Sequence, residues 1–275
     1  MNRQHRPRKR FGQNFLIDSQ VIEKIIQCLH PAATEHLIEI GPGQGVLTER
    51  LLASGAPLHA IEIDRDLAAW LRQRFGHYPN FSLIEQDVLK LDFNDLLSAE
   101  NPARIIGNLP YNISSPLLFH LMAYLAGITD MLFMLQLEVV DRMSAKPDSR
   151  DYGRLSIMTQ YFCEVEKLFE VPSQAFSPAP RVTSAVVKLV PHPPASLPLK
   201  HPLTLENLLR QAFAQRRKTL RNNLQGLLLE SDLRSLQIDP GLRPENLSLD
   251  DYVRICLWLE QRKGNPDSHH DTADA

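Results

Sequence analysis

Long apolar runs, paired cysteines and internal repeats are all missing from this chain of 275 residues. No segment approaches the roughly 18 apolar residues of a transmembrane helix, so we expect no membrane span. The basic start, MNRQHRPRKRFGQNFL, is not followed by an apolar segment, which argues against a secretory signal. The isolated cysteines Cys28, Cys163 and Cys256 favour buried thiols in a reducing compartment over disulfides or a metal site. We therefore expect a cytoplasmic protein without a bound metal.

The charge is distributed unevenly, although the net charge is only −2. Residues 1–10 and 210–221 are rich in arginine and lysine and contain no acid, whereas the chain after residue 231 is rich in acids. The second cluster comprises Arg210, Arg216, Arg217, Lys218 and Arg221. Two acid-free clusters are compatible with a polyanionic partner, and also with solvated charged surfaces.

Short apolar segments alternate with amphipathic stretches over the first two thirds of the chain, which predicts an α/β fold with a mostly parallel sheet. The expected strands are 36–40, 58–63, 81–86, 103–108, 130–136, 163–171 and 184–190. Helical patterns follow the first, second and fourth strands, and two more precede the sixth. The last two strands follow each other across the proline-rich loop 172–180, which predicts a hairpin at the sheet edge.

Prolines within 191–202 interrupt any regular element, and the pattern beyond them is entirely helical. We expect helices over 204–215, 220–229, 233–236 and 249–261. The predicted organisation is therefore a basic arm at 1–18, a catalytic domain at 19–192, a small all-helical C-terminal domain at 200–263 and a disordered tail at 264–275. Low apolar content is the reason for the last assignment.

A glycine-rich turn, GPGQG, follows the first expected strand and starts at Gly41. Glu62 ends the second strand, where a carboxylate can accept both hydroxyls of a ribose. Asp87 and Val88 follow the third strand and suit an adenine amino group and ring. Nicotinamide and S-adenosylmethionine sites share this geometry. The GxGxG spacing favours S-adenosylmethionine, as does an acid at Glu39 that suits an ammonium group through water or backbone.

The fourth strand ends in Asn108-Leu109-Pro110-Tyr111. An exocyclic adenine N6 is a poor nucleophile, because its lone pair is delocalised into the ring. The Asn108 side-chain oxygen, with the carbonyl of Leu109 or Pro110, would hold the two N–H groups and release that lone pair. Pro110 would stiffen the turn, and Tyr111 would offer a face on which a base stacks. An ordinary turn explains the same four residues if they are considered alone.

The tetrad resembles that of the rRNA adenine N6-methyltransferases, a resemblance that covers about residues 8–260. It implies a Rossmann-like class I methyltransferase fold with a seven-stranded sheet, and S-adenosyl-L-methionine as cofactor. Asn14 and Leu16, within FGQNFL, resemble the segment that closes over the methionine end of the cofactor. The resemblance makes Gly41, Glu62, Asp87 and Asn108 cofactor contacts. It also implies that Phe176, in FSPAPRVTS, stacks on the target adenine opposite Tyr111.

Two further segments, 152–156 and 213–224, resemble the bacterial small-subunit dimethyladenosine transferases. This branch implies N6-dimethylation of two adjacent adenosines near the 3′ end of 16S rRNA, within an assembling 30S subunit, and we expect a monomer. Leu137 departs from the family, which usually has lysine there. The basic segment 216–221 would contact phosphates.

Four alternatives remain open at this point. A large-subunit rRNA adenine N6-methyltransferase would share the tetrad and the cofactor turn. An assembly factor that acts mainly by binding would need the basic segments and not the tetrad. A DNA adenine methyltransferase would differ in its nucleic-acid partner alone. A nicotinamide-dependent dehydrogenase is disfavoured, because the GxGxxG spacing is missing.

Overall fold

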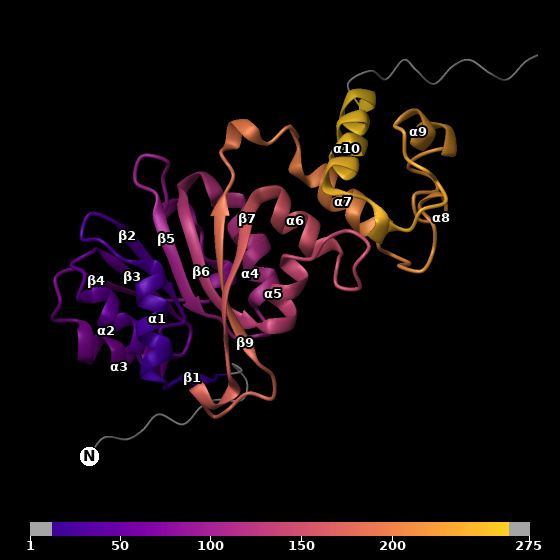
Figure 1. Ribbon diagram of the computed structural model, residues 1–275. Helices are drawn as coiled ribbons and strands as arrows, with labels where there is room; N and C mark the ends of the chain where they lie inside the picture. Colours follow the sequence, from indigo (N-terminus) through magenta and orange to yellow (C-terminus); the bar gives the residue numbers. More distant parts are fainter. Residues whose placement is uncertain (1–12, 264–275) are drawn as a thin grey trace, which may run out of the picture. The chain divides into compact units, whose positions relative to one another are not determined.

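The computed structural model describes residues 13–263, which form two compact units (Figure 1). Among the described residues, the sheet unit contains 13–140 and Cys163–Pro191, and the helical unit contains Asp141–Phe162 and 192–263. Most of the predicted basic arm and the whole predicted tail at 264–275 lie outside the described residues. Each unit is considered by itself.

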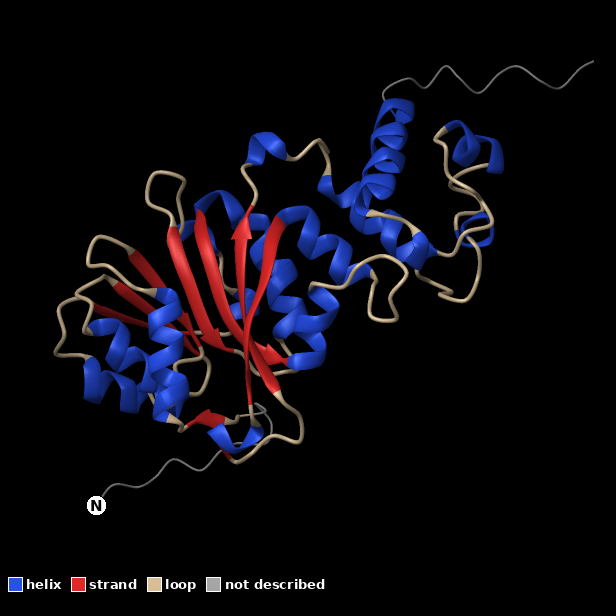
Figure 2. Cartoon of the chain, in the orientation of Figure 1, coloured by secondary structure: helices blue, strands red, loops and turns tan. Residues whose placement is uncertain are grey.

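The sheet unit is built on one seven-stranded sheet (Figure 2), which confirms the predicted fold class. Its strands are β2 (His36–Ile40), β3 (Leu58–Glu62), β4 (Phe81–Glu85), β5 (Ala103–Asn108), β6 (Ile128–Gln136), β7 (Cys163–Val171) and β9 (Ser184–Pro191). The spatial order is β4-β3-β2-β5-β6-β9-β7. The first five strands are parallel, and β9 is antiparallel to both β6 and β7. The sixth and seventh strands therefore form the predicted hairpin.

The strand order reverses beside β2, which places a crevice at the carboxyl edge of the sheet. Ile40 at the end of β2 pairs with Ile61 of β3 on one side and with Gly107 of β5 on the other. The loop that follows β2 therefore lies between the ends of its two neighbours. Ligands of open parallel sheets bind at such a switch point.

Successive residues of a strand point to opposite faces of the sheet, and both faces are apolar and are covered by helices. α1 (Ser19–Leu29), α2 (Val46–Leu52) and α3 (Arg65–Phe75) contribute to one core cluster with strand residues such as Leu37 and Ile106. The adjacent residues Ile38 and Ile105 are fully buried but do not belong to that cluster, and α4 (Ser114–Leu121) is a further helix of this unit. Helix α1 begins where the Asp18 carboxylate accepts from two backbone N–H groups, which caps its first turn.

The helical unit contains α6 (Arg154–Phe162), α7 (Pro202–Ala212), α8 (Leu220–Asn223), α9 (Glu230–Ser235) and α10 (Leu249–Lys263). Helix α5 (Leu137–Met143) crosses the boundary at Val140. The division differs from the predicted domain boundary, since α6 packs against α7 and α10 and so groups with the C-terminal helices. The expected helix over 220–229 is also wrong beyond Asn223, because Gly226 adopts a left-handed conformation with φ 84°.

Two very short strands were not predicted. β1 (Phe15–Leu16) pairs antiparallel with β8 (Phe176–Ser177), and the Ile17 N–H donates to the Ala175 carbonyl. This pairing brings residues 13–17 against the loop between β7 and β9. The 3-10 helices are η2 (Val88–Lys90), η3 (Phe93–Asp95), η4 (Met122–Gly127), η5 (Ser173–Ala175), η6 (Pro194–Ser196) and η7 (Pro244–Asn246). None of the helices within residues 13–263 has the length and apolar character that a membrane crossing needs.

Candidate cofactor and catalytic cavity

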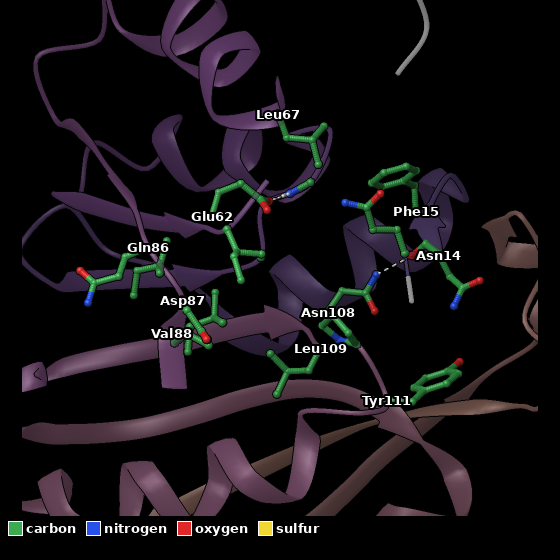
Figure 3. A pocket seen from close by; sticks show the side chains of 17 residues that line it. Asn14, Phe15, Glu62, Leu67, Gln86, Asp87, Val88, Asn108, Leu109 and Tyr111 are labelled. Atoms are coloured by element: carbon green, nitrogen blue, oxygen red, sulfur yellow. Dashed lines mark hydrogen bonds between the residues drawn. The ribbon is translucent and has the colours of Figure 1, made fainter. Parts of the chain in front are cut away.

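A single cavity in the sheet unit collects most of the residues that the sequence predicted for the site (Figure 3). It opens at the carboxyl ends of β2, β3, β4 and β5. The predicted residues that line it are Asn14, Gly41, Glu62, Asp87, Val88, Asn108, Pro110 and Tyr111. They come from five separate segments of the chain. The order of the strands in the sheet brings these segments together.

The Glu62 carboxylate is held rigidly at the floor of the cavity. One oxygen accepts from the Gly43 N–H at 3.2 Å and the other from the Asp64 N–H at 2.9 Å. Burial raises the pKa of Glu62, and these backbone donors oppose the rise. Each oxygen keeps a further lone pair, so the side chain can still accept from a pair of ribose hydroxyls.

The glycine turn approaches the N-terminal segment very closely. Gly43 has φ 56°, and a Cβ atom built there would come within 3.1 Å of the Phe15 ring. A side chain at position 43 would therefore need both a strained backbone and a displaced aromatic ring. The turn leaves its backbone open to the cavity, as the amino-acid end of a cofactor would require.

The carboxyl end of β4 supplies an acceptor beside an apolar wall. One Asp87 oxygen accepts from the Leu89 N–H at 3.1 Å, which caps η2 and leaves the second oxygen for a ligand. Val88 is buried, whereas Ile63 is 44% exposed and lines the same cavity. Two apolar side chains beside a carboxylate acceptor are the chemistry that an adenine ring and its amino group require.

The side chain of Asn108 has a defined orientation. Its Nδ2 donates to the backbone carbonyl of Asn14 at 3.0 Å, shown by a dashed line in Figure 3. A carbonyl can only accept, so the amide nitrogen must face Asn14. The Asn108 oxygen therefore remains an acceptor at the wall of the cavity, as the predicted chemistry requires.

The remaining tetrad residues are also constrained. The Pro110 carbonyl accepts from the Ser114 hydroxyl at 3.2 Å and from the Ile113 N–H at 3.1 Å, so it serves the start of α4. The Leu109 N–H donates to the Met134 carbonyl, which ties the turn to β6. The Tyr111 hydroxyl lies 2.9 Å from the Ser184 hydroxyl, and the ring lines the cavity.

Glu39 lies deeper than a direct contact with an ammonium group would suggest. It is 2% exposed and accepts a hydrogen bond from the Thr48 hydroxyl at 2.6 Å. Burial raises the pKa of Glu39 to about 7, against the lowering effect of the Thr48 hydrogen bond. The side chain borders a small recess beside the glycine turn, which it shares with Leu16 and Asn108.

Two predicted residues do not reach the main cavity. Leu16 is 2% exposed and borders only the smaller recess. Phe176 is 4% exposed and belongs to the apolar core cluster, so the structure does not place it opposite Tyr111. The physical reason is the pairing of β1 with β8, which sets Phe176 against Leu16 and buries both side chains.

Several lining residues escaped the sequence reasoning, among them Gln13, Phe15, Ile63 and Leu67. Ile63 could have been found, because it is an apolar residue directly after the acid that ends β3. Phe15 and Gln13 carry no such signal. Their place depends on the pairing of β1 with β8, which joins segments about 160 residues apart in the chain.

In the basic segment between α7 and α8, one arginine already makes hydrogen bonds within the helical unit. Arg216 donates from Nε to Glu245 at 2.8 Å, and its Nη2 donates to the carbonyls of Arg150 and Tyr152. Arg216 therefore holds the backbone of its own unit instead of projecting freely. Arg217 and Lys218 are exposed and carry no such bonds among the described residues.

Comparison with known proteins agrees with this geometry. The family described as "Ribosomal RNA adenine dimethylase" matches residues 4–261. The chain is 54% identical to a ribosomal RNA small subunit methyltransferase A of Hahella chejuensis, over 93% of each chain. A dimethyladenosine transferase from Plasmodium falciparum is 28% identical with a TM-score of 0.78, over 90% of this chain and 98% of the other. The 23S rRNA methyltransferase ErmE, at 24% identity and a TM-score of 0.66, shares the fold over 90% of this chain and 100% of its own.

Proposed function

The chain belongs to the ribosomal RNA adenine dimethylase family, and we propose that it transfers methyl groups from S-adenosyl-L-methionine to the N6 atoms of two adjacent adenosines near the 3′ end of 16S rRNA. The observation that carries the chemistry is the orientation of Asn108, whose side-chain oxygen remains available at the cavity wall. The 54% identity to a small-subunit methyltransferase supports the choice of RNA.

The cavity residues fit the cofactor from end to end. Glu62 would accept from the ribose hydroxyls, and Asp87 would accept from the adenine amino group between Ile63 and Val88. Gly41, the open backbone of the glycine turn and Asn14 would surround the amino-acid end. When bound, the cofactor supplies an electrophilic methyl group on a sulfonium, so no strong general base is required.

The protein's part in the reaction is to hold the adenine N6 atom in position. The Asn108 oxygen accepts one N–H, and the Leu109 carbonyl is the better second acceptor because the Pro110 carbonyl already serves Ser114 and Ile113. Two acceptors drive the nitrogen toward tetrahedral geometry and direct its lone pair into the cavity. Tyr111 offers the stacking face, and catalysis is mainly positioning in a site that excludes water.

The remaining parts of the proposal concern the substrate's setting. We infer that the enzyme acts as a monomer in the cytoplasm, on 30S subunits that are still being assembled. Arg217 and Lys218 would contact phosphates and orient the RNA without reading its sequence. A target adenine must leave its stack to enter the cavity, which favours a loop or an unpaired junction.

The direct test is incubation with tritiated S-adenosyl-L-methionine and 30S subunits that lack these methyl groups, followed by nucleoside analysis. We expect label in N6,N6-dimethyladenosine from the 3′ end of 16S rRNA. Matched assays with 50S subunits and with a DNA hairpin of the same sequence separate the alternatives. Transfer to 23S rRNA or to DNA in preference to 16S rRNA would overturn the proposed substrate.

A further inference from the structure

Tyr111, whose ring would stack on the target base, is held by a hydrogen bond to a residue far along the chain. Its hydroxyl lies 2.9 Å from the hydroxyl of Ser184, 73 positions further along the chain. Tyr111 itself sits in the turn between β5 and α4 and is only partly buried. The bond therefore connects a turn residue at the cavity with a different part of the sheet.

Ser184 is a rigid anchor. It is 1% exposed and is the first residue of β9, where it lies opposite Gln136 of β6 and Val171 of β7. Its position is thus fixed by a strand on either side. The next residue back, Thr183, accepts at its carbonyl from the Leu137 N–H, so the loop is fastened to α5 just before β9 begins.

We propose that Ser184 is a positioning residue, which fixes the place of the Tyr111 ring on which the target adenine stacks. The inference rests on the function proposed above. Rotation about χ1 swings the tyrosine hydroxyl through space, so a hydrogen bond from that hydroxyl to a fixed point holds χ1 and with it the place of the ring. With Phe176 in the core, Tyr111 is the aromatic residue that lines the cavity beside Asn108 and can stack on the adenine.

The proposal separates two kinds of effect. Ser184 is not among the residues that line the cavity, so loss of its hydroxyl should leave affinity for the cofactor unchanged. The substitution removes no charge, so affinity for the subunit should also be unchanged. The effect should fall on kcat, because a misaligned ring holds the adenine N6 atom away from its productive position.

The experiment compares Ser184→Ala, Tyr111→Phe and the double variant with the wild type on unmethylated 30S subunits. We expect kcat to fall by about threefold to tenfold in each single variant, as for loss of one hydrogen bond. The double variant should lose no more than the larger single loss, because both substitutions remove the same bond. Calorimetry with S-adenosyl-L-methionine should give unchanged affinity.

Ser54→Ala is the matched control, since the Ser54 hydroxyl donates to the Leu51 carbonyl at the end of α2 and does not contact the catalytic turn. It should leave kcat unchanged. If Ser184→Ala fails to fold, Tyr111→Phe still tests the proposal. It removes the same hydrogen bond by a change at the partly exposed residue of the pair.

Two results would overturn the positioning role. One is a wild-type kcat in Ser184→Ala. The other is a double variant whose loss equals the product of the two single losses. A wild-type enzyme that transfers no methyl group to 16S rRNA would instead refute the proposed function.

Discussion

In the sheet unit most motif residues face a cavity, whereas in the helical unit Arg216 and Asn223 face the protein's own backbone. Glu62, Asp87 and Asn108 each keep an acceptor directed at the cavity after their structural bonds are made. Arg216 and Asn223 instead direct their donors at backbone carbonyls, with Asn223 donating to Gln215 and Lys218. These motif residues therefore indicate a binding site in the sheet unit and backbone stabilisation in the helical unit.

Asn108→Ala should produce the largest effect and tests the first half of that contrast. Methyl transfer should fall by about 10²–10³-fold, since a group that acts on the reacting atom is removed. The melting temperature should change little, and binding to 30S subunits should persist. Filter binding and tritium transfer on the same preparation measure both quantities. A variant that keeps half of the activity would show that the amide oxygen is not the acceptor.

A pH experiment on Glu39 tests the buried acid beside the glycine turn. Burial raises the pKa of Glu39 from its ordinary 4.5 to about 7 in the folded chain. Between these values the folded state holds a proton that the unfolded state has lost. The contribution of Glu39 is therefore fully present below pH 4.5 and is lost as pH rises through 7. The total loss is up to about 3 kcal/mol.

Glu39→Gln removes that titration and keeps an acceptor for the Thr48 hydroxyl. The free energy of unfolding of the variant, relative to the wild type, should rise between pH 4.5 and pH 7. Urea titrations at several pH values measure the difference. Glu49→Gln, at an exposed position paired with Arg74, is the control. Parallel pH profiles for Glu39→Gln and the wild type would contradict the prediction.

Arg216→Ala tests the second half of the contrast. We expect a loss of about 1–2 kcal/mol in unfolding free energy, limited because the side chain is 45% exposed. Backbone amides of residues around 150–152 should lose protection against hydrogen exchange. Arg217→Ala is the matched control and should leave that protection unchanged. Equal loss of protection in Arg216→Ala and Arg217→Ala would show that Arg216 has no special role in holding this backbone.

Arg217→Ala should have the smallest effect, and we expect that effect in RNA affinity alone. Loss of one phosphate contact should weaken affinity for 30S subunits a few-fold and reduce the slope of log affinity against log salt by about one. Titrations at four salt concentrations measure the slope. An unchanged slope would show that the exposed cations of this segment do not contact phosphates.

The sequence predicted the regular part of the molecule well because local patterns determine it. Apolar segments of β-branched and aliphatic residues marked all seven strands, and the acids at their carboxyl ends marked Glu62 and Asp87. These residues follow from where a parallel strand ends. Asn108 was predicted for the same reason.

Long-range pairing was not predictable in the same way. The two-residue strands β1 and β8 have no periodicity to detect, yet their pairing buries Phe176 and brings Phe15 to the glycine turn. The role of Arg216 was hidden because its partners are backbone carbonyls, which any residue supplies. The grouping of α6 with the C-terminal helices depends on packing between segments separated by the whole of β7 and β9.

The carbonyl of Asn14 that orients Asn108 belongs to the main chain. Replacing the Asn14 side chain would leave that acceptor in place, so a survey by alanine scanning would report nothing about it. Only a change in the backbone path, such as a deletion within residues 13–16 or an ester in place of an amide there, would expose the dependence. Most point mutations therefore leave intact the backbone acceptor that orients this catalytic side chain.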